Sequence, residues 1–209
     1  MTDKKQLIAF MGLKQTGKDY NSQPYIKLGF KKIALADPLR EMAWNILGYN
    51  PDLQGNIPYN EFKNNILFTK ENKKILNIPH TKEVEITSIR KILQNLGTEC
   101  KKLFGEDYWC NQWYISVINS ESNVVVTDIR FPNEINTVLK LKDADYDVSF
   151  VWCQYEGADY KNILKDCHES EMLNQFIYCN RLKYGLHDGS IIDEKTMKAI
   201  LEDFSKRIG

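Results

Sequence analysis

Residues 12–18 have the types and spacing that suit the binding of a polyphosphate. An apolar run ends in Gly12, and Gly17 and Lys18 follow after four intervening residues. This is the G-x-x-x-x-G-K pattern of the P-loop, whose backbone N–H groups turn toward phosphate oxygens while its lysine reaches the outer phosphates. Lys14 adds a second cation within the loop, although an exposed loop lysine would look the same. We therefore predict a phosphate site directly after the first apolar run.

The residue after Lys18 departs from the P-loop pattern. A Ser or Thr hydroxyl usually holds Mg²⁺ at this position, and here the residue is Asp19. A carboxylate can bind Mg²⁺ directly or through its water shell, because Mg²⁺ keeps several waters in proteins. Asp19 is therefore the candidate metal ligand. Its alternative role is that of a residue stabilising the start of a helix.

Two further polar clusters follow apolar runs. Asp37 and Arg40 come after the second run, and Asp128 and Arg130 come after the run 123–127. Ligands of parallel α/β sheets bind beyond the carboxyl ends of the strands, so we expect these clusters near the glycine loop. An acid in the place of Asp128 suits a Mg²⁺ or acceptor-positioning role, and a guanidinium stabilises the charge of phosphoryl transfer. A salt bridge between Asp128 and Arg130 is the alternative reading.

Alternating strands and helices would position these residues. We predict strands at 7–11, 32–35, 123–128, 147–153 and 176–179, and helices at 37–47, 88–96, 107–118, 131–142 and 196–208. A helix starting at Lys18 should be short or kinked because Pro24 falls within it. The pattern predicts an α/β fold, a three-layer sandwich around a central parallel sheet of about five strands.

One stretch does not fit this alternation. Residues 49–87 are rich in Asn and Lys, contain three prolines and have broken apolar patterns. We interpret them as an irregular insertion and a candidate flap on the acceptor side of a single domain, residues 1–209.

The overall composition limits the classes of partner. Lys and Arg together number 28, as do Asp and Glu, whereas proteins that bind nucleic-acid polymers usually have a basic excess. The absence of an 18-residue apolar stretch predicts no membrane span, and we expect no secretory signal. Five scattered cysteines without a C-x-x-C pair predict neither a disulfide framework nor a zinc site, and favour the cytoplasm.

Together, the motifs resemble those of the tailed-phage deoxynucleoside monophosphate kinases, relatives of adenylate kinase among the P-loop kinases. Four blocks carry the resemblance: Gly12–Asp19, Ile33–Arg40, Arg90–Glu99 with Trp109 downstream, and Val126–Glu134. A fifth block, His168–Glu171, resembles the family's H-x-S-E loop. The family has G-K-D as its usual loop ending, so the resemblance implies that Asp19 is the acid near Mg²⁺.

The resemblance implies a P-loop kinase fold and the reaction ATP + dNMP → ADP + dNDP with Mg²⁺. It assigns catalysis to Lys18, Asp19, Asp128 and Arg130. The residues implied for ATP are Gly12, Lys14, Thr16, Gly17, Lys18, Asp19 and Asn180. Those implied for the acceptor nucleotide are Asp37, Arg40, Arg90, Gln94, Thr98, Glu99, Trp109, Asp128, Arg130 and Glu171. It further implies a homodimer, located in the host cytoplasm if the chain is phage-encoded.

Two alternative functions stay open. Phosphomevalonate kinases of the animal type share a G-K-D loop and a D-x-R strand end, but the segment Leu93–Glu99 and the nearby aromatic residues favour a nucleotide. A non-catalytic nucleotide-binding protein could also keep this fold. The presence of both Lys18 and Arg130 favours an enzyme.

Overall fold

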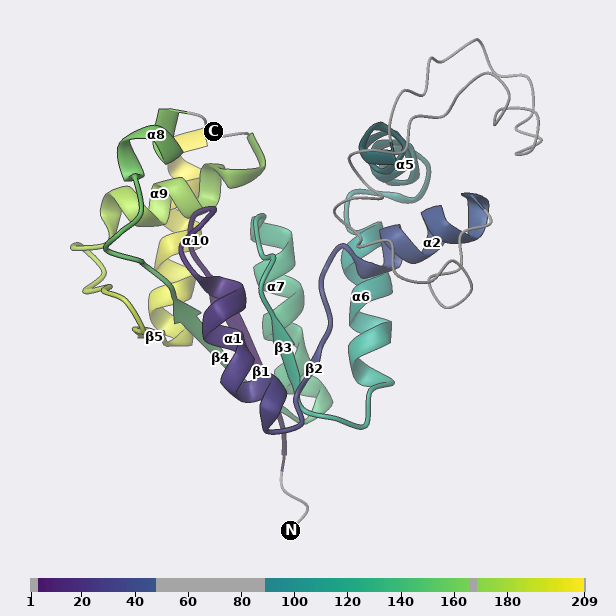
Figure 1. The fold of residues 1–209 in the computed structure, drawn as a ribbon, viewed down its shortest axis with the longest axis horizontal. Coiled ribbons are helices and arrows are strands. Elements are labelled where there is room, and N and C mark those ends of the chain that lie inside the picture. The colour runs from purple at the N-terminus through teal and green to yellow at the C-terminus, as the bar shows by residue number, and fades with distance from the viewer. Residues whose placement is uncertain (1–3, 48–88, 166–168, 209) are drawn as a thin grey trace. The chain divides into compact units, whose positions relative to one another are not determined.

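A computed structural model of the chain describes residues 4–47, 89–165 and 169–208 (Figure 1). The chain divides into two compact units, one formed by Met1–Leu35 with Cys110–Gly209 and the other by Ala36–Trp109. The insertion predicted at 49–87, with its flap, and His168 of the fifth block lie outside the described residues. The single domain stays a prediction.

The first unit is built on a five-stranded sheet in the order β2-β3-β1-β4-β5. The strands are β1 (Lys5–Met11), β2 (Lys31–Lys32), β3 (Val124–Val126), β4 (Tyr146–Trp152) and β5 (Ile191–Ile192). β1 pairs in parallel with β3 and β4, β2 is parallel to β3, and β5 is antiparallel to β4. The fold is thus α/β with a mostly parallel central sheet, as predicted.

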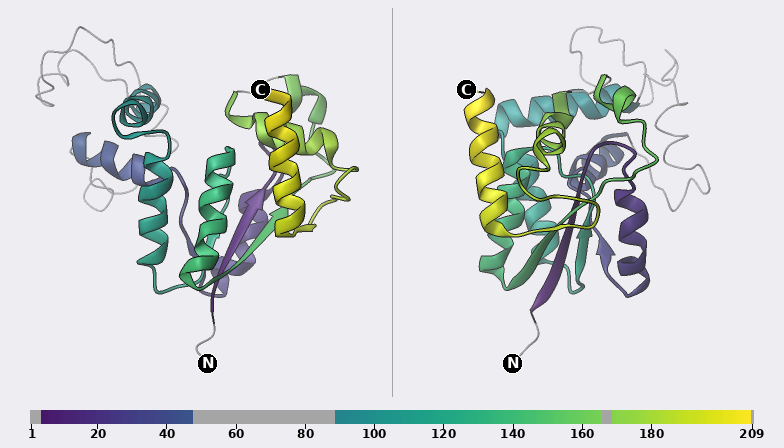
Figure 2. Two further views of the ribbon diagram at one scale, coloured as in Figure 1. Left: turned by 180° about the vertical axis from the view of Figure 1, so that it is seen from behind. Right: turned by 90° about the vertical axis from the view of Figure 1, so that its left-hand side faces the viewer.

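Helices cover both faces of this sheet. Leu7, Ala9 and Met11 of β1 belong to the larger core, which also contains residues of α7 (Pro132–Lys140) and α10 (Glu194–Ile208). Phe10 belongs to the smaller core, against which Tyr25 of α1 (Lys18–Lys27) packs. Successive strand residues point to opposite faces, so one short strand supplies both cores. Figure 2 shows α1 and α10 on opposite sides of the sheet, which confirms the three layers.

The second unit contains α2 (Asp37–Leu47), α5 (Ile89–Phe104) and the start of α6 (Tyr108–Ile118). The prediction that a helix ends before Gly97 is wrong, because α5 continues to Phe104. A Cβ at Gly97 would lie 3.4 Å from Leu39 Cδ2, so this glycine allows close packing of α2 on α5. The helix ends instead before Gly105, whose φ of +98° is a left-handed conformation.

Two predicted strands differ from the structure. Residues 176–179 lie in α9 (Met172–Asn180), in which Leu173, Phe176 and Ile177 are buried at helical spacing. The fifth strand is β5, further along the chain. The second strand ends at Lys32, although the N–H of Ile33 still donates to the Val125 carbonyl at 3.1 Å. The remaining short helices are η1 (Leu141–Ala144), α8 (Tyr160–Lys165) and η2 (Glu169–Glu171).

The other predicted elements agree with the structure to within a few residues at each end. α1 is ten residues long and contains Pro24, so the short first helix is confirmed. Among the described helices, none has the length and apolar character needed to cross a membrane.

Candidate active site

The glycine loop begins where β1 and β4 end side by side. Gly12 has a φ of +147°, and a Cβ on it would lie 2.4 Å from the Cys153 carbonyl oxygen. The Cys153 N–H in turn donates to the Met11 carbonyl at 2.7 Å. Because the atom nearest to such a Cβ belongs to the backbone of Cys153, a side chain at position 12 would displace the loop. The glycine is therefore required by close approach as well as by conformation.

Lys18 folds back over this loop. Its Nζ donates to the carbonyl oxygens of Gly12 at 2.8 Å and Leu13 at 2.6 Å. Burial lowers the pKa of Lys18, while the carboxylate of Glu171 acts in the opposite direction. A partly buried ammonium is stabilised by an approaching anion, because Coulomb attraction is stronger where water is partly excluded. Phosphate binding by Lys18 stays a prediction, and this environment is compatible with it.

The remaining loop residues hold the loop in shape. Gln15 and Gly17 have φ values of +64° and +81°. Thr16 is buried, and its Oγ1 donates to the Leu13 carbonyl at 2.8 Å. Successive N–H groups in such turns form concavities that bind anions. The predicted ATP contact of the Thr16 side chain stays a prediction, since its hydroxyl proton serves the loop.

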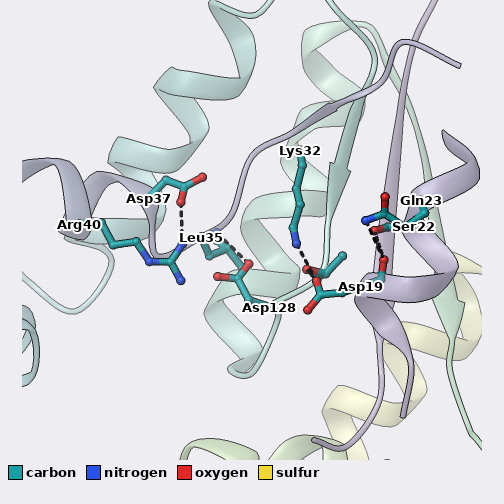
Figure 3. Close-up of polar contacts among 9 residues, drawn as sticks. Asp19, Ser22, Gln23, Lys32, Leu35, Asp37, Arg40 and Asp128 are labelled. Carbon is teal, nitrogen blue, oxygen red and sulfur yellow. Dashed lines mark hydrogen bonds and ion pairs between the residues drawn. The ribbon is translucent and has the colours of Figure 1, made fainter. Parts of the chain in front are cut away.

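Asp19 lies in the first turn of α1, and its Oδ1 atom receives two donors. Lys32 Nζ approaches Oδ1 to 2.6 Å, and Thr127 Oγ1 donates to it at 2.7 Å. Figure 3 shows Lys32 extending to this carboxylate. Burial acts to raise the pKa of Asp19, but the two hydrogen bonds outweigh it and hold the pKa below its usual value. The carboxylate is therefore ionised at neutral pH.

The oxygen atoms at Asp19 fit a magnesium ion that is held mainly by substrate phosphates and waters rather than by the protein. Mg²⁺ prefers oxygen ligands, and sites in phosphoryl-transfer enzymes use one or two carboxylates plus substrate phosphates and waters. Within the described ranges, no three His, Cys, Asp or Glu side chains gather where they could hold a metal together. Asp19, with the Thr127 hydroxyl beside it, would supply the protein's share of such a site.

Asp128 follows β3 and fixes the segment after β2. Its Oδ1 accepts the N–H of Leu35 at 2.9 Å (Figure 3). This hydrogen bond gives the Asp128 carboxylate a structural role. Its predicted part in catalysis stays a prediction.

Arg130 contacts the short helix η2, whose last residue is Glu171. Its Nη1 lies 3.2 Å from Ser170 Oγ and 3.6 Å from Glu171 Oε1. Glu171 is 8% exposed, and its second oxygen, Oε2, is buried without a hydrogen-bond donor. A buried carboxylate oxygen lacking a donor is costly, which marks a place where a bound molecule's hydroxyl or amino group would be stabilised. Lys18, Arg130 and Glu171 thus form one charged cluster.

Glu134 supports Arg130 from the start of α7. Its Oε2 accepts the backbone N–H groups of Arg130 at 2.6 Å and Phe131 at 3.0 Å. Burial raises the pKa of Glu134 to about 7, although these two hydrogen bonds act to lower it. The side chain therefore fixes the backbone at Arg130.

In the second unit, the predicted acceptor residues lie on α2 and α5. Arg40 Nη1 pairs with Asp37 Oδ1 at 2.7 Å, within the first turn of α2. Gln94 and Thr98 are exposed one helical turn apart, and the Thr98 hydroxyl donates to the Gln94 carbonyl. Arg90 lies one turn earlier in α5, and its side chain is outside the described residues.

Two other predicted acceptor residues of this unit are engaged within it. Glu99 pairs with Lys102 at 2.8 Å. Trp109 is 8% exposed, and its indole N–H donates to the Gly97 carbonyl at 3.0 Å. Stacking of the Trp109 ring on a base stays a prediction.

Asn180 is the last residue of α9 and does not follow a strand as predicted. Its Nδ2 donates to the Phe176 carbonyl at 2.8 Å. ATP contact by Asn180 stays a prediction. Sequence reasoning missed Lys32 and Thr127, which lie at the carboxyl ends of β2 and β3. Their position at that edge of a parallel sheet was the available signal.

The chain matches the model of a known protein family. A family model described as "Deoxynucleotide monophosphate kinase" matches residues 42–172, more than half of the chain. No curated protein matches the chain. The matched range includes Arg130 and Glu171 and begins after the glycine loop. The loop geometry and the family match are therefore separate observations.

Proposed function

Because the chain belongs to the deoxynucleotide monophosphate kinase family, we propose that it transfers the γ-phosphoryl group of ATP to a deoxynucleoside monophosphate, giving ADP and the diphosphate. The observation that carries the choice of donor is the loop after β1. There, Lys18 is partly buried and donates to loop carbonyls at the carboxyl end of a parallel sheet, a position suited to a polyphosphate. ATP dependence is thus inferred from a part of the chain outside the family match.

The chemistry requires positioning and charge neutralisation. The acceptor phosphate is already an anion, so no side chain needs to form a covalent intermediate. Lys18 and Arg130 would offset the charge that accumulates on the transferred group. Glu171 would hold Arg130 at this place, since it pairs with the guanidinium and is itself buried.

A bound Mg²⁺ would supply positive charge that offsets the negative charge of the donor's phosphates. Asp19 would face that ion, with Thr127 orienting the carboxylate. The loop backbone around Gly12 and Gly17 would hold the phosphates. On the acceptor side, Arg40 would bind the monophosphate, and Gln94 and Thr98 would offer an amide and a hydroxyl to the nucleoside.

A coupled ADP-release assay with dGMP, dTMP, dCMP and dAMP as separate acceptors tests the proposal. We expect Mg²⁺-dependent ADP release with at least one of them, and formation of the corresponding diphosphate in the product mixture. Phosphomevalonate serves as an acceptor from outside the nucleotide class. Turnover with phosphomevalonate alone would refute the nucleotide assignment, and tight ATP binding without turnover on any acceptor would favour a binding protein.

A further inference from the structure

Lys32 holds the carboxylate to which the metal side of the site is assigned. Its Nζ lies 2.6 Å from Asp19 Oδ1, and both side chains retain solvent access, at 37% and 73% exposure. An ion pair with this exposure adds little to fold stability, because solvent screens it. Fold stability therefore does not explain why the Lys32–Asp19 pair lies beside the glycine loop.

Lys32 is carried by a strand and Asp19 by a helix. Lys32 is the last residue of β2, and it is in register with Val125 of β3. Thr127 follows β3 directly and donates to the same Asp19 oxygen at 2.7 Å. Two neighbouring strand ends thus direct one ammonium and one hydroxyl at Oδ1.

We propose that Lys32 is the resident counter-ion of Asp19 and competes with Mg²⁺ for this carboxylate, so that metal-nucleotide binding requires the Lys32–Asp19 contact to open. The inference rests on the proposed function, in which Asp19 is the metal-side acid. An ammonium at hydrogen-bond distance and a divalent cation repel each other when both approach one carboxylate oxygen. Lys32 would thereby stay paired with Asp19 in the absence of nucleotide, and would weaken the contribution of the metal to nucleotide affinity.

Lys32 could alternatively act on the nucleotide itself, by contacting phosphate oxygens. This role and the proposed one predict different effects of Mg²⁺ on ADP binding. A phosphate contact strengthens ADP binding with and without Mg²⁺, whereas a competitor for Asp19 weakens only the advantage that Mg²⁺ confers. The informative quantity is therefore the ratio of ADP dissociation constants in EDTA and in Mg²⁺.

Isothermal titration calorimetry of the full chain with ADP, in EDTA and in saturating Mg²⁺, measures this ratio without any turnover. We expect Lys32→Met to raise the ratio about threefold over wild type, the scale of one exposed ion pair. Lys31→Met is the matched control, since Lys31 is the adjacent exposed residue of β2 and carries the same charge. It should leave the ratio unchanged.

The substitution Asp19→Asn completes a double-mutant cycle. In that background, Lys32→Met should have no effect on the ratio, because the carboxylate for which the two cations compete is gone. An unchanged or lowered ratio in Lys32→Met, or an equal rise in Lys31→Met, would overturn the proposal. ADP binding with the expected ratios but without kinase activity would overturn only the proposed reaction. Failure of ADP to bind any variant would overturn both.

Discussion

At the scale of single residues, Lys18 is the side chain whose environment differs most from that of an ordinary lysine. It is partly buried, donates to two loop carbonyls, and has a pKa lowered by burial. An ammonium held by fixed hydrogen bonds needs little reorganisation when a phosphate arrives. In the proposed reaction, Lys18 would stabilise the negative charge that develops on the transferred group.

Replacing Lys18 by methionine keeps the length of the side chain and removes its charge. We expect kcat to fall by at least about 100-fold, as for other fixed electrostatic donors. Steady-state ADP release at saturating acceptor measures the loss. Lys27→Met makes the same change on an exposed residue of the same helix and should retain wild-type kcat. A Lys18→Met variant with near-normal kcat would remove the loop from the mechanism.

Glu134 gives the stability of the protein a specific dependence on pH. Its pKa in the folded chain is raised from 4.5 to about 7 by burial. Between these values, the folded chain binds a proton that the unfolded chain has released. By linkage, this group's contribution to stability is fully present at low pH and is lost as the pH rises toward 7.

Glu134→Gln lacks this titration but keeps an oxygen that can accept the N–H groups of Arg130 and Phe131. Relative to wild type, the variant should gain about 1–2 kcal/mol in unfolding free energy between pH 4.5 and 8, less than the full linkage value because solvent partly screens the group. Urea denaturation at several pH values measures the difference. For the control Glu121→Gln, which changes an exposed residue, the difference in unfolding free energy from wild type should not vary with pH. A difference for Glu134→Gln that does not vary with pH would contradict the raised pKa.

At the scale of elements, the glycine loop depends on how closely β1 and β4 end together. The Gly12 backbone leaves no room for a Cβ beside the Cys153 carbonyl, whereas Gly29, which also has a positive φ, has no atom within 4 Å of such a Cβ. The two glycines share a left-handed backbone and differ in their neighbours. Alanine substitutions at the two positions therefore separate the free-energy cost of an unfavourable backbone conformation from the cost of a steric clash.

Gly29→Ala should lower the unfolding free energy by about 1 kcal/mol, the conformational penalty alone. Gly12→Ala should lower it by about 3 kcal/mol, because the loop must also move away from β4. It should in addition weaken ADP binding more than tenfold, since the displaced N–H groups no longer converge. Thermal unfolding and calorimetry measure the two effects, and equal costs for the two variants would show that the contact is unimportant.

The elements also show which parts of the molecule sequence reasoning could reach. β1 and β3 follow from apolar runs that end in polar loops, and α10 follows from its helical periodicity. The apolar run at 176–179 suggests a strand because short apolar runs have no distinctive period, and only the burial of Leu173 with Phe176 and Ile177 reveals the helix. Gly97 resembles a helix end in the sequence, whereas in the structure it makes room for Leu39, a contact that depends on tertiary packing.

The site divides in the same way. Motif spacing predicts Lys18, Asp19 and Arg130 as site residues, and their roles stay predictions. The hydrogen bonds of Lys32 and Thr127 to Asp19 do not follow from spacing, because they depend on the order of strands in the sheet as well as on the position of each residue at a strand end. The raised pKa of Glu134 depends on burial, which spacing does not determine.

At the scale of the whole molecule, the residues expected to bind ATP lie in the first compact unit, whereas those expected to contact the nucleoside of the acceptor lie in the second. Asp128, Arg130 and Glu171, which are also expected to bind the acceptor, belong to the first unit. The loop residues and Lys18 belong to the first unit, and Gln94 and Thr98 belong to the second. Ligand binding slows amide exchange most where backbone opening is coupled to the occupied site. ADP alone should therefore protect the glycine loop, and the acceptor alone should protect α5.

Hydrogen exchange followed by mass spectrometry tests this division. ADP should slow exchange in peptides covering residues 12–21, and a deoxynucleoside monophosphate alone should slow it in peptides within 91–104, because an occupied site adds RT ln(1 + [L]/Kd) to the free energy of opening. At 100 times Kd, this is about 2.7 kcal/mol, or roughly a 100-fold slower exchange for amides that open with the site. Lys18→Met should abolish the first effect and preserve the second, since its substitution lies outside the second unit. Protection of residues 12–21 by the monophosphate alone, with none in 91–104, would mean that α5 does not carry the nucleoside contacts and that the acceptor binds entirely within the first unit.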